Sequence, residues 1–120
     1  MSAKKTILVA DDMEDVIENI ELILGEDEYN YLTAQSGEEA IKVLMDNDVD
    51  LVITDIAMPG GNGLELIKSM KKLAKPPKIV MVTGYASMFP EDDEAKADAV
   101  IEKPWDNNDL IQTVKGLLIS

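Results

Sequence analysis

Side chains that can do chemistry follow four short apolar runs of this 120-residue chain. They are three carboxylates, a hydroxyl and an ammonium: Asp11 and Asp12 after residues 7–10, Asp55 after residues 51–54, Thr83 after residues 79–82, and Lys103 after residues 99–102. Short runs rich in Val, Ile and Leu are typical of strands buried on both faces of a parallel sheet. Ligands of such sheets bind just beyond the carboxyl ends of the strands, so the sequence predicts one site at one edge of one sheet.

The three carboxylates indicate a site for a divalent cation. Like charges raise the cost of ionising all three, and Mg²⁺, which prefers oxygen ligands, offsets that cost. Asp11, Asp12 and Asp55 fit this pattern, and Lys103 adds a positive charge on the other side of Asp55. A cation and an ammonium beside one carboxylate suit transfer of a phosphoryl group to it, because that reaction depends mainly on positioning and charge stabilisation. The Thr83 hydroxyl can then hydrogen-bond a phosphoryl oxygen.

Each of these residues also has a purely structural interpretation. Asp11 and Asp12 could cap the first helix, and Asp55 could be only a turn residue. Thr83 could be structural, and Lys103 could be a surface lysine. We favour a functional site because all of these positions fall together at strand ends.

Segments with helical periodicity lie between the strand-like runs. Apolar residues recur with helical spacing in residues 16–24, 40–45, 64–74 and 110–118. Gly25 offers a stop for the first helix, and Ser36 with Glu39 forms an N-terminal capping box for the second. Pro76 and Pro77 should end the third helix, and the last should begin near Asp106 or Asn107. Residues 29–33 read as a further, partly exposed strand.

This alternation predicts an α/β fold built from βαβ units with right-handed crossovers. Five units give a flavodoxin-like, doubly wound five-stranded parallel sheet of order 2-1-3-4-5 with about five helices. Residues 86–97 should hold the fourth helix, but they have hardly any apolar stripe, so we expect it to be short or irregular. We expect one domain over residues 1–120, with a core of about residues 5–118.

Composition excludes several classes of function. The chain has no cysteine and no histidine, which rules out disulfides, thiolate metal sites, cysteine nucleophiles and phosphohistidine chemistry of its own. A formal net charge of −13 opposes direct binding to nucleic acid and favours basic partner surfaces. No apolar run approaches the ~20 residues that span a bilayer, and no secretion signal is visible, so we expect a cytoplasmic domain without a membrane partner.

These motifs resemble those of the receiver domains of two-component response regulators, the CheY-like superfamily, across nearly the whole chain. The matching pieces are Asp11-Asp12, residues 50–59 around Asp55, Gly63, Thr83 followed by Gly84, and Lys103-Pro104. The resemblance implies that Asp55 accepts a phosphoryl group from a histidine kinase or a histidine phosphotransfer protein.

The resemblance also implies the role of each site residue. Mg²⁺ would be bound by Asp12 and Asp55, with Asp11 acting largely through water and the Ala57 carbonyl as a further ligand. Lys103 would contact the phosphoryl group, and Thr83 would be the switch hydroxyl. The Lys103-Pro104 peptide bond is expected to be cis, which X-Pro pairs tolerate.

The sequence departs from the family pattern at the switch. Val100 stands where receivers usually carry the aromatic partner of the threonine. Tyr85 could take that role, as in a subset of receivers with a Thr-Gly-Tyr segment. Because Ala57 cannot hydrogen-bond an attacking water through its side chain and Tyr85 could shield Asp55, we expect slow to moderate self-dephosphorylation.

The favoured interpretation is a signalling phosphoacceptor that assists its own phosphorylation and dephosphorylation, and not an enzyme that turns over a metabolite. A Mg²⁺-dependent phosphohydrolase is less favoured, because that class usually has Asp-x-Asp where this chain has adjacent aspartates. A pseudo-receiver that only binds partners is a second alternative, against which the intact Asp55, Thr83 and Lys103 set argues.

Contacts with the phosphodonor are expected at the first helix and after the last strand. Val16 and Ile20 more naturally face the core, whereas Trp105 is expected to be an exposed aromatic beside the site. The start at Met1 favours a free-standing regulator over a piece of a larger one. The cognate kinase, the downstream effector and the oligomeric state stay open.

Overall fold

Five parallel strands form one sheet in the order β2-β1-β3-β4-β5, as predicted. The computed structural model describes residues 4–55, 63–83, 97–103 and 105–119. The strands are β1 (Thr6–Ala10), β2 (Asn30–Ala34), β3 (Leu51–Asp55), β4 (Lys78–Thr83) and β5 (Ala99–Glu102). Every neighbouring pair is parallel, so the carboxyl ends of all five strands lie at the same edge of the sheet.

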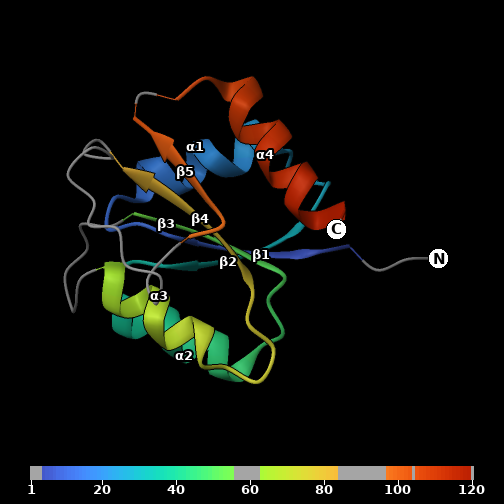
Figure 1. Ribbon diagram of the computed structural model, residues 1–120. Helices are drawn as coiled ribbons and strands as arrows, with labels where there is room; N and C mark the ends of the chain where they lie inside the picture. Colours follow the sequence, from blue (N-terminus) through green and yellow to red (C-terminus); the bar gives the residue numbers. More distant parts are fainter. Residues whose placement is uncertain (1–3, 56–62, 84–96, 104, 120) are drawn as a thin grey trace.

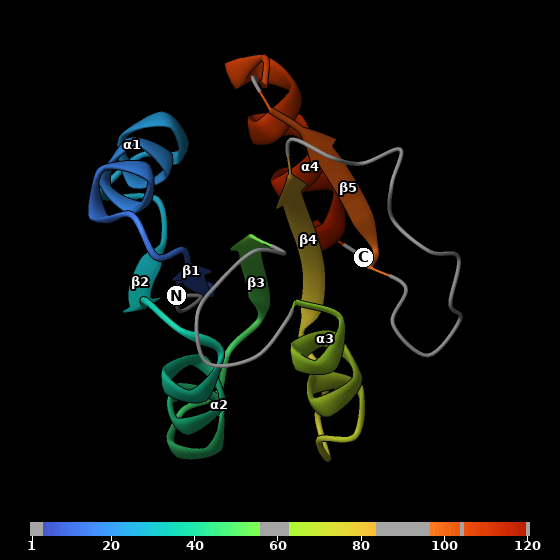
Figure 2. The same cartoon turned by 90° about the vertical axis from the view of Figure 1, so that its left-hand side faces the viewer.

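Helices cover both faces of the sheet (Figure 1). One face carries α1 (Glu14–Leu24) and α4 (Asn107–Ile119), and the other carries α2 (Gly37–Asp46) and α3 (Gly63–Lys71) (Figure 2). The helix expected over residues 86–97 falls almost entirely outside the described residues. None of the helices in the described part of the chain is long and apolar enough to cross a bilayer.

The alternation of side chains along each strand produces two hydrophobic cores. Ile7 and Val9 of β1 pack with α1 and α4, whereas Leu8 and Ala10 pack with α2 and α3. All four are at most 1% exposed. Burial on both faces explains why the strand sequences are continuous apolar runs.

The predicted starts of α2 and α4 are confirmed. The Ser36 hydroxyl accepts a hydrogen bond from the Glu39 N–H at 3.1 Å. The Asp106 carboxylate accepts hydrogen bonds from the N–H groups of Asn108 (2.8 Å) and Asp109 (3.3 Å) at the start of α4. These bonds satisfy donors that the first turn of a helix otherwise leaves unpaired.

Two predicted boundaries were wrong. The strand expected at residues 29–33 begins one residue later, at Asn30. Helix α3 ends at Lys71 and does not continue to the prolines; the Leu73 N–H instead donates to the Met70 carbonyl at 3.2 Å in a tighter turn. Leu73 still packs against the α2–α3 core, so the apolar pattern continues beyond the end of the helix.

Gly25 ends α1 in a backbone conformation that side chains rarely adopt. Its φ is 104°, and its N–H donates to the Glu21 carbonyl at 3.0 Å. A Cβ at this position would lie 2.8 Å from Cγ of Glu28. The backbone angle therefore requires glycine here, and a Cβ would in addition force the exposed Glu28 side chain to shift.

Replacing Gly25 by alanine should lower the free energy of unfolding by about 1–2 kcal/mol, because an L-residue is strained at this φ. Gly116→Ala is the matched control: nothing lies within 4 Å of a Cβ there, and it stands inside α4. That variant should be more stable than the parent by about 0.5–1 kcal/mol. Urea denaturation of both variants measures the difference, and equal shifts of the same sign would contradict this view of Gly25.

Candidate functional site

The parallel register brings three carboxylates together at the carboxyl edge of the sheet. Ala10 of β1 lies opposite Thr54 of β3, so Asp11 and Asp55 are neighbours across two adjacent strands. One carboxylate oxygen from each of Asp11, Asp12 and Asp55 lies within 4.8 Å of the other two. Asp11 is buried, at 3% exposure, whereas Asp12 is exposed. The predicted carboxylate cluster is therefore present.

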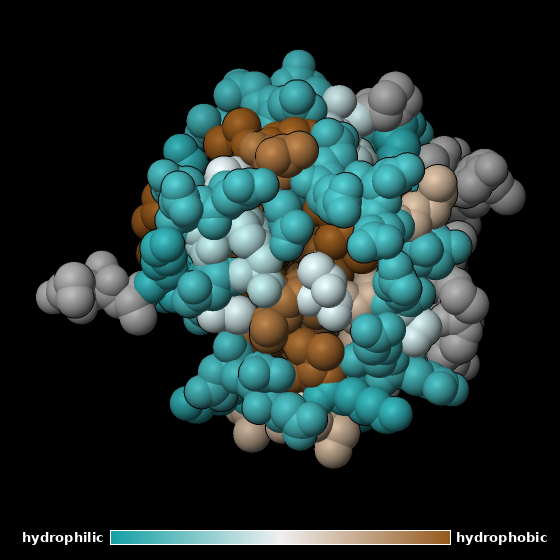
Figure 3. All heavy atoms as spheres, turned by 180° about the vertical axis from the view of Figure 1, so that it is seen from behind, coloured by the Kyte–Doolittle hydropathy of each residue, from teal (hydrophilic) through white to brown (hydrophobic). Residues whose placement is uncertain are grey.

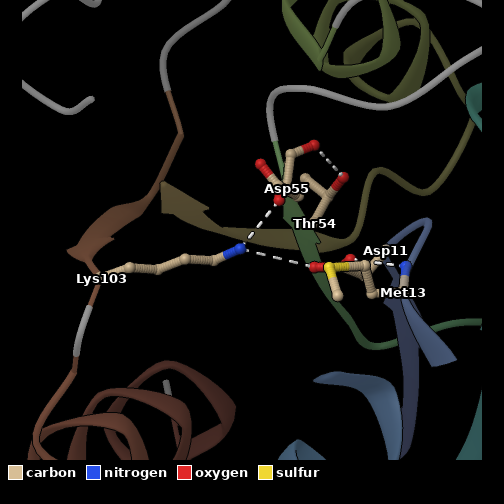
Figure 4. Close-up of polar contacts among 5 residues, drawn as sticks. All are labelled: Asp11, Met13, Thr54, Asp55 and Lys103. Atoms are coloured by element: carbon tan, nitrogen blue, oxygen red, sulfur yellow. Dashed lines mark hydrogen bonds and ion pairs between the residues drawn. The ribbon is translucent and has the colours of Figure 1, made fainter. Parts of the chain in front are cut away.

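Lys103 reaches this cluster from the end of β5 (Figure 4). Its ammonium donates a hydrogen bond to Oδ2 of Asp55 at 2.9 Å and lies 3.7 Å from Oδ2 of Asp11. The side chains of Lys103 and Asp55 are 30% and 14% exposed, so the pair is only partly screened by water. A single described ammonium thus faces three carboxylates, and the cluster keeps an excess of negative charge.

Burial and charge shift the pKa values of two groups in this cluster. Burial raises the pKa of Asp11 above its ordinary value of 3.8, and the hydrogen bond from Met13 and the charge of Lys103 offset this only in part. For Lys103, burial lowers the pKa, but the hydrogen bond to Asp55 and the charges of Asp55 and Asp11 outweigh it, so the net pKa is raised. An added cation would favour the ionised form of Asp11.

Asp11 also shapes the turn into α1. Its Oδ1 accepts a hydrogen bond from the Met13 N–H at 2.9 Å, which closes a short turn. The residue at the N-cap of α1 is Met13, and no side chain caps this helix end. The alternative that Asp11 or Asp12 is the helix cap was therefore wrong, although Asp11 does order the approach to the helix.

Sequence reasoning missed two residues beside the site. Thr54 is completely buried, and its hydroxyl donates to the main-chain oxygen of Asp55 at 3.0 Å (Figure 4). Met13 is 58% exposed next to the carboxylates. The one available signal was the hydroxyl of Thr54 within the apolar run before Asp55; nothing in the sequence marked Met13.

Some of the remaining predicted residues lie outside the described part of the chain, and the others lie within it. Thr83 ends β4 opposite Glu102 of β5, which puts its backbone at the same edge; its side chain, like Ala57, Tyr85 and Pro104, lies outside the described residues. Val100 is 47% exposed on β5. Trp105 is half-buried and packs against the α1–α4 core, so the expectation of an exposed aromatic was wrong. Ile20 is buried and Val16 packs against the same core, as expected.

Comparison with known proteins identifies the family. The family model of the response regulator receiver domain matches residues 7–115. The chain belongs to this family. Its members are signalling domains of two-component systems, and the fold, the strand order and the position of the carboxylate cluster described above agree with that membership.

This chain matches only part of each curated relative. The chain is 29% identical over 114 residues to the transcriptional regulatory protein CpxR of Klebsiella pneumoniae, which covers 93% of this chain and 48% of the relative. It is 40% identical over 77 residues to the response regulator GtcR of Aneurinibacillus migulanus, covering 64% of this chain and 32% of the relative. The chain spans about half the length of CpxR.

Solved structures match over nearly the full length. The response regulator protein TrrA of Thermotoga maritima, in complex with Mg²⁺-BeF, is 38% identical with a TM-score of 0.85, and the match covers 95% of this chain and 99% of TrrA. A CheY-like receiver domain protein from Methanospirillum hungatei is 31% identical with a TM-score of 0.86, covering 98% and 95%.

Asp11→Asn should stabilise the protein at neutral pH without Mg²⁺. Because burial raises the pKa of Asp11, the folded state binds a proton more tightly than the unfolded state. The free energy of unfolding then contains a term that falls as pH rises through this pKa and is regained on acidification towards 3.8. The free energy of unfolding of the variant should therefore be larger than that of the parent at pH 7, and the two values should converge at low pH.

Urea denaturation across this pH range tests the Asp11 effect. Asp48→Asn is the control, since Asp48 is exposed and lies outside the cluster. A destabilised Asp11→Asn protein at neutral pH would show that the hydrogen bond to Met13 and the Lys103 contact outweigh the burial of charge.

Proposed function

We propose that the chain, as a single receiver domain, accepts a phosphoryl group on Asp55 from the phosphohistidine of a histidine kinase or a histidine phosphotransfer protein. The observation that carries this proposal is the arrangement around Asp55. Its carboxylate is clustered with two others and held at 2.9 Å by the Lys103 ammonium. Family membership supports the class of reaction, and the contacts of Asp55 support it as the acceptor.

The described residues fit a Mg²⁺ site. Carboxylate oxygens are the ligands that Mg²⁺ prefers, and the three acids carry more negative charge than Lys103 offsets. Asp12 and Asp55 would be direct ligands with the Ala57 carbonyl, and the buried Asp11 would act through water. Bound Mg²⁺ would supply positive charge against the oxygens of the phosphoryl group. The Mg²⁺-BeF complex of TrrA supports this assignment.

Asp55, Lys103 and Asp11 have different roles in the transfer step. One oxygen of Asp55 attacks phosphorus, the P–N bond of the phosphohistidine breaks, and its electron pair stays on the leaving imidazole nitrogen, so Asp55 becomes an acyl phosphate. Because the Asp55 carboxylate loses its negative charge when it forms the acyl phosphate, the Lys103 ammonium moves to a phosphoryl oxygen. Asp11 keeps that ammonium close to the site, at 3.7 Å before transfer.

The response to phosphorylation is proposed to run through Thr83 and Lys103. The Thr83 hydroxyl would hydrogen-bond a phosphoryl oxygen and draw the end of β4 towards Asp55. Val100 is half-exposed on β5 and offers no aromatic ring, so Tyr85 is proposed as the aromatic partner. Tyr85, with Ala57, is also proposed to limit the approach of water, which would make dephosphorylation slow to moderate.

Intact mass spectrometry tests phosphoryl uptake. Incubation with acetyl phosphate, and separately with phosphoramidate to mimic the P–N bond of phosphohistidine, should add one phosphoryl group only when Mg²⁺ is present. Asp55→Asn should add none. No uptake from either donor, with the fold intact, would instead indicate a pseudo-receiver. Steady release of inorganic phosphate without labelled protein would indicate a phosphohydrolase.

Lys103→Gln should change Mg²⁺ binding and phosphoryl uptake in opposite directions. Removing the ammonium takes away a positive charge that competes with the cation, so Mg²⁺ should bind more tightly. Phosphoryl uptake should slow by about 10²-fold, the cost of losing one preorganised electrostatic contact in a transition state.

Calorimetric titration with Mg²⁺ and the rate of mass gain measure the two effects of Lys103→Gln. The control is Lys115→Gln, which removes an exposed lysine of α4 and should change neither quantity. Parallel losses of Mg²⁺ affinity and uptake would show that Lys103 only maintains the structure of the site.

A further inference from the structure

The charges of this chain are separated along its sequence. Residues 6–41 contain eleven acidic residues and no basic one, whereas residues 66–90 contain five lysines and no acidic residue. The phosphoacceptor chemistry does not require this separation, because only Asp11 and Asp12 of the first segment and none of these lysines belong to the cluster. The exposed residues of each segment within the described part of the chain are therefore candidates for surfaces of opposite charge.

The acidic surface is the outer side of α1. Glu14, Asp15 and Glu18 are exposed there, and Glu26 is exposed just beyond the helix. Leu22, one turn after Glu18 and one turn before Glu26, is 64% exposed between them. The view from this side shows hydrophilic residues over most of the surface, with apolar atoms between them (Figure 3). We call these five residues the acidic α1 face.

The basic surface lies where α3 ends and the chain turns towards β4. Lys71, Lys72 and Lys75 are exposed, and Lys78 is half-buried at the start of β4. We call these four residues the lysine strip. Favourable interaction with the negative end of the helix dipole explains Lys71, which is in the last turn of α3. It does not explain Lys72 and Lys75, which follow the helix and form no ion pair with any described residue.

The turn that carries the lysine strip is firmly anchored. Leu73 packs against the α2–α3 core, and Pro77 is buried. The lysines are therefore presented from an ordered turn, so a partner would not have to order it on binding.

A groove of about 870 Å³ adjoins the lysine strip at the amino edge of the sheet. Its apolar lining includes Leu73, Pro76, Leu117 and Leu118. Lys5, Lys75 and Lys78 are balanced there by Asp46, Asp48 and Asp50, so the groove itself is close to neutral. Lys75 and Lys78 belong both to the lysine strip and to the groove, whereas Lys71 and Lys72 lie outside the groove lining and are the part of the strip that the aspartates of the groove do not balance. The apolar part of the groove suits an apolar side chain, and Lys71 and Lys72 suit acidic residues beside it.

The two surfaces cannot meet within one molecule. Helix α1 lies over one face of the sheet on the β2 side, whereas α3 lies under the other face on the β4 side (Figure 2). Any contact between them must therefore join two copies. Because different surfaces of each copy are used, such a contact is head-to-tail and leaves one surface of each kind free at the ends.

We propose that the acidic α1 face of one copy docks on the lysine strip of a second copy, with Leu22 entering the adjoining groove. The net charge of −13 on each copy opposes association at long range. At physiological ionic strength, however, charges more than about 8 Å apart are largely screened, and the local pairing of opposite charges decides the contact. The assembly is weak and open-ended, since it rests on exposed ion pairs and one apolar side chain.

Sedimentation equilibrium of the unphosphorylated protein tests this contact. In about 0.1 M NaCl the weight-average mass should rise with concentration past that of a dimer, and in about 1 M NaCl, where screening acts within ~3 Å, it should return to the monomer. Lys72→Glu with Lys75→Glu should weaken association by about tenfold or more, as should Glu18→Lys with Glu26→Lys.

Mixing the two charge-reversed proteins should restore association, because each then offers the surface that the other can bind. The matched control is Lys42→Glu with Lys115→Glu, which makes the same change in net charge at exposed positions of α2 and α4 and should associate like the parent. A parent that stays monomeric at all concentrations would overturn the proposal. Association that strengthens with salt would also overturn it. So would equal weakening by the Lys72/Lys75 and the Lys42/Lys115 substitutions, or a mixture of the two charge-reversed proteins that fails to associate.

Discussion

The shared carboxyl edge of the parallel strands is the constraint on which the site depends. Asp11 and Asp55 become neighbours because β1 and β3 are adjacent and in register. Lys103 follows β5, two strands away from β3, and only the length of a lysine side chain lets its ammonium reach Asp55 at 2.9 Å. Helices α1, α2 and α3 connect β1, β2, β3 and β4 in turn, so residues far apart in the sequence arrive at one edge of the sheet.

This arrangement is electrostatically unfavourable on its own terms. Three carboxylates lie close together, and burial raises the pKa of Asp11. Ionised Asp11 therefore lowers the free energy of unfolding. Lys103 relieves part of that cost. The two cores, one on each face of the sheet, hold the strands in place despite the repulsion that remains. A bound cation would reduce the repulsion that remains among the three carboxylates.

Much of this could be predicted from the sequence, because strands buried on both faces leave a clear signal. The apolar runs before Asp11, Asp55 and Lys103 predicted the strands. The tendency of ligands to bind beyond the carboxyl ends of parallel strands predicted the cluster. The end of α3 could not be found in this way, since Leu73 continues the apolar stripe from a turn and not from a helix. Trp105 was misjudged for a related reason: burial depends on how α4 packs across the sheet, which local periodicity does not encode.

Asp55 is proposed as the phosphoryl acceptor among three clustered carboxylates. A mass gain cannot distinguish the three, but reduction of an acyl phosphate with borohydride converts that one aspartate to homoserine. Peptide mapping of protein treated with phosphodonor and Mg²⁺ and then reduced should find homoserine at position 55 alone. Homoserine at position 11 or 12, or labelled protein with no homoserine at all, would contradict the assignment of Asp55.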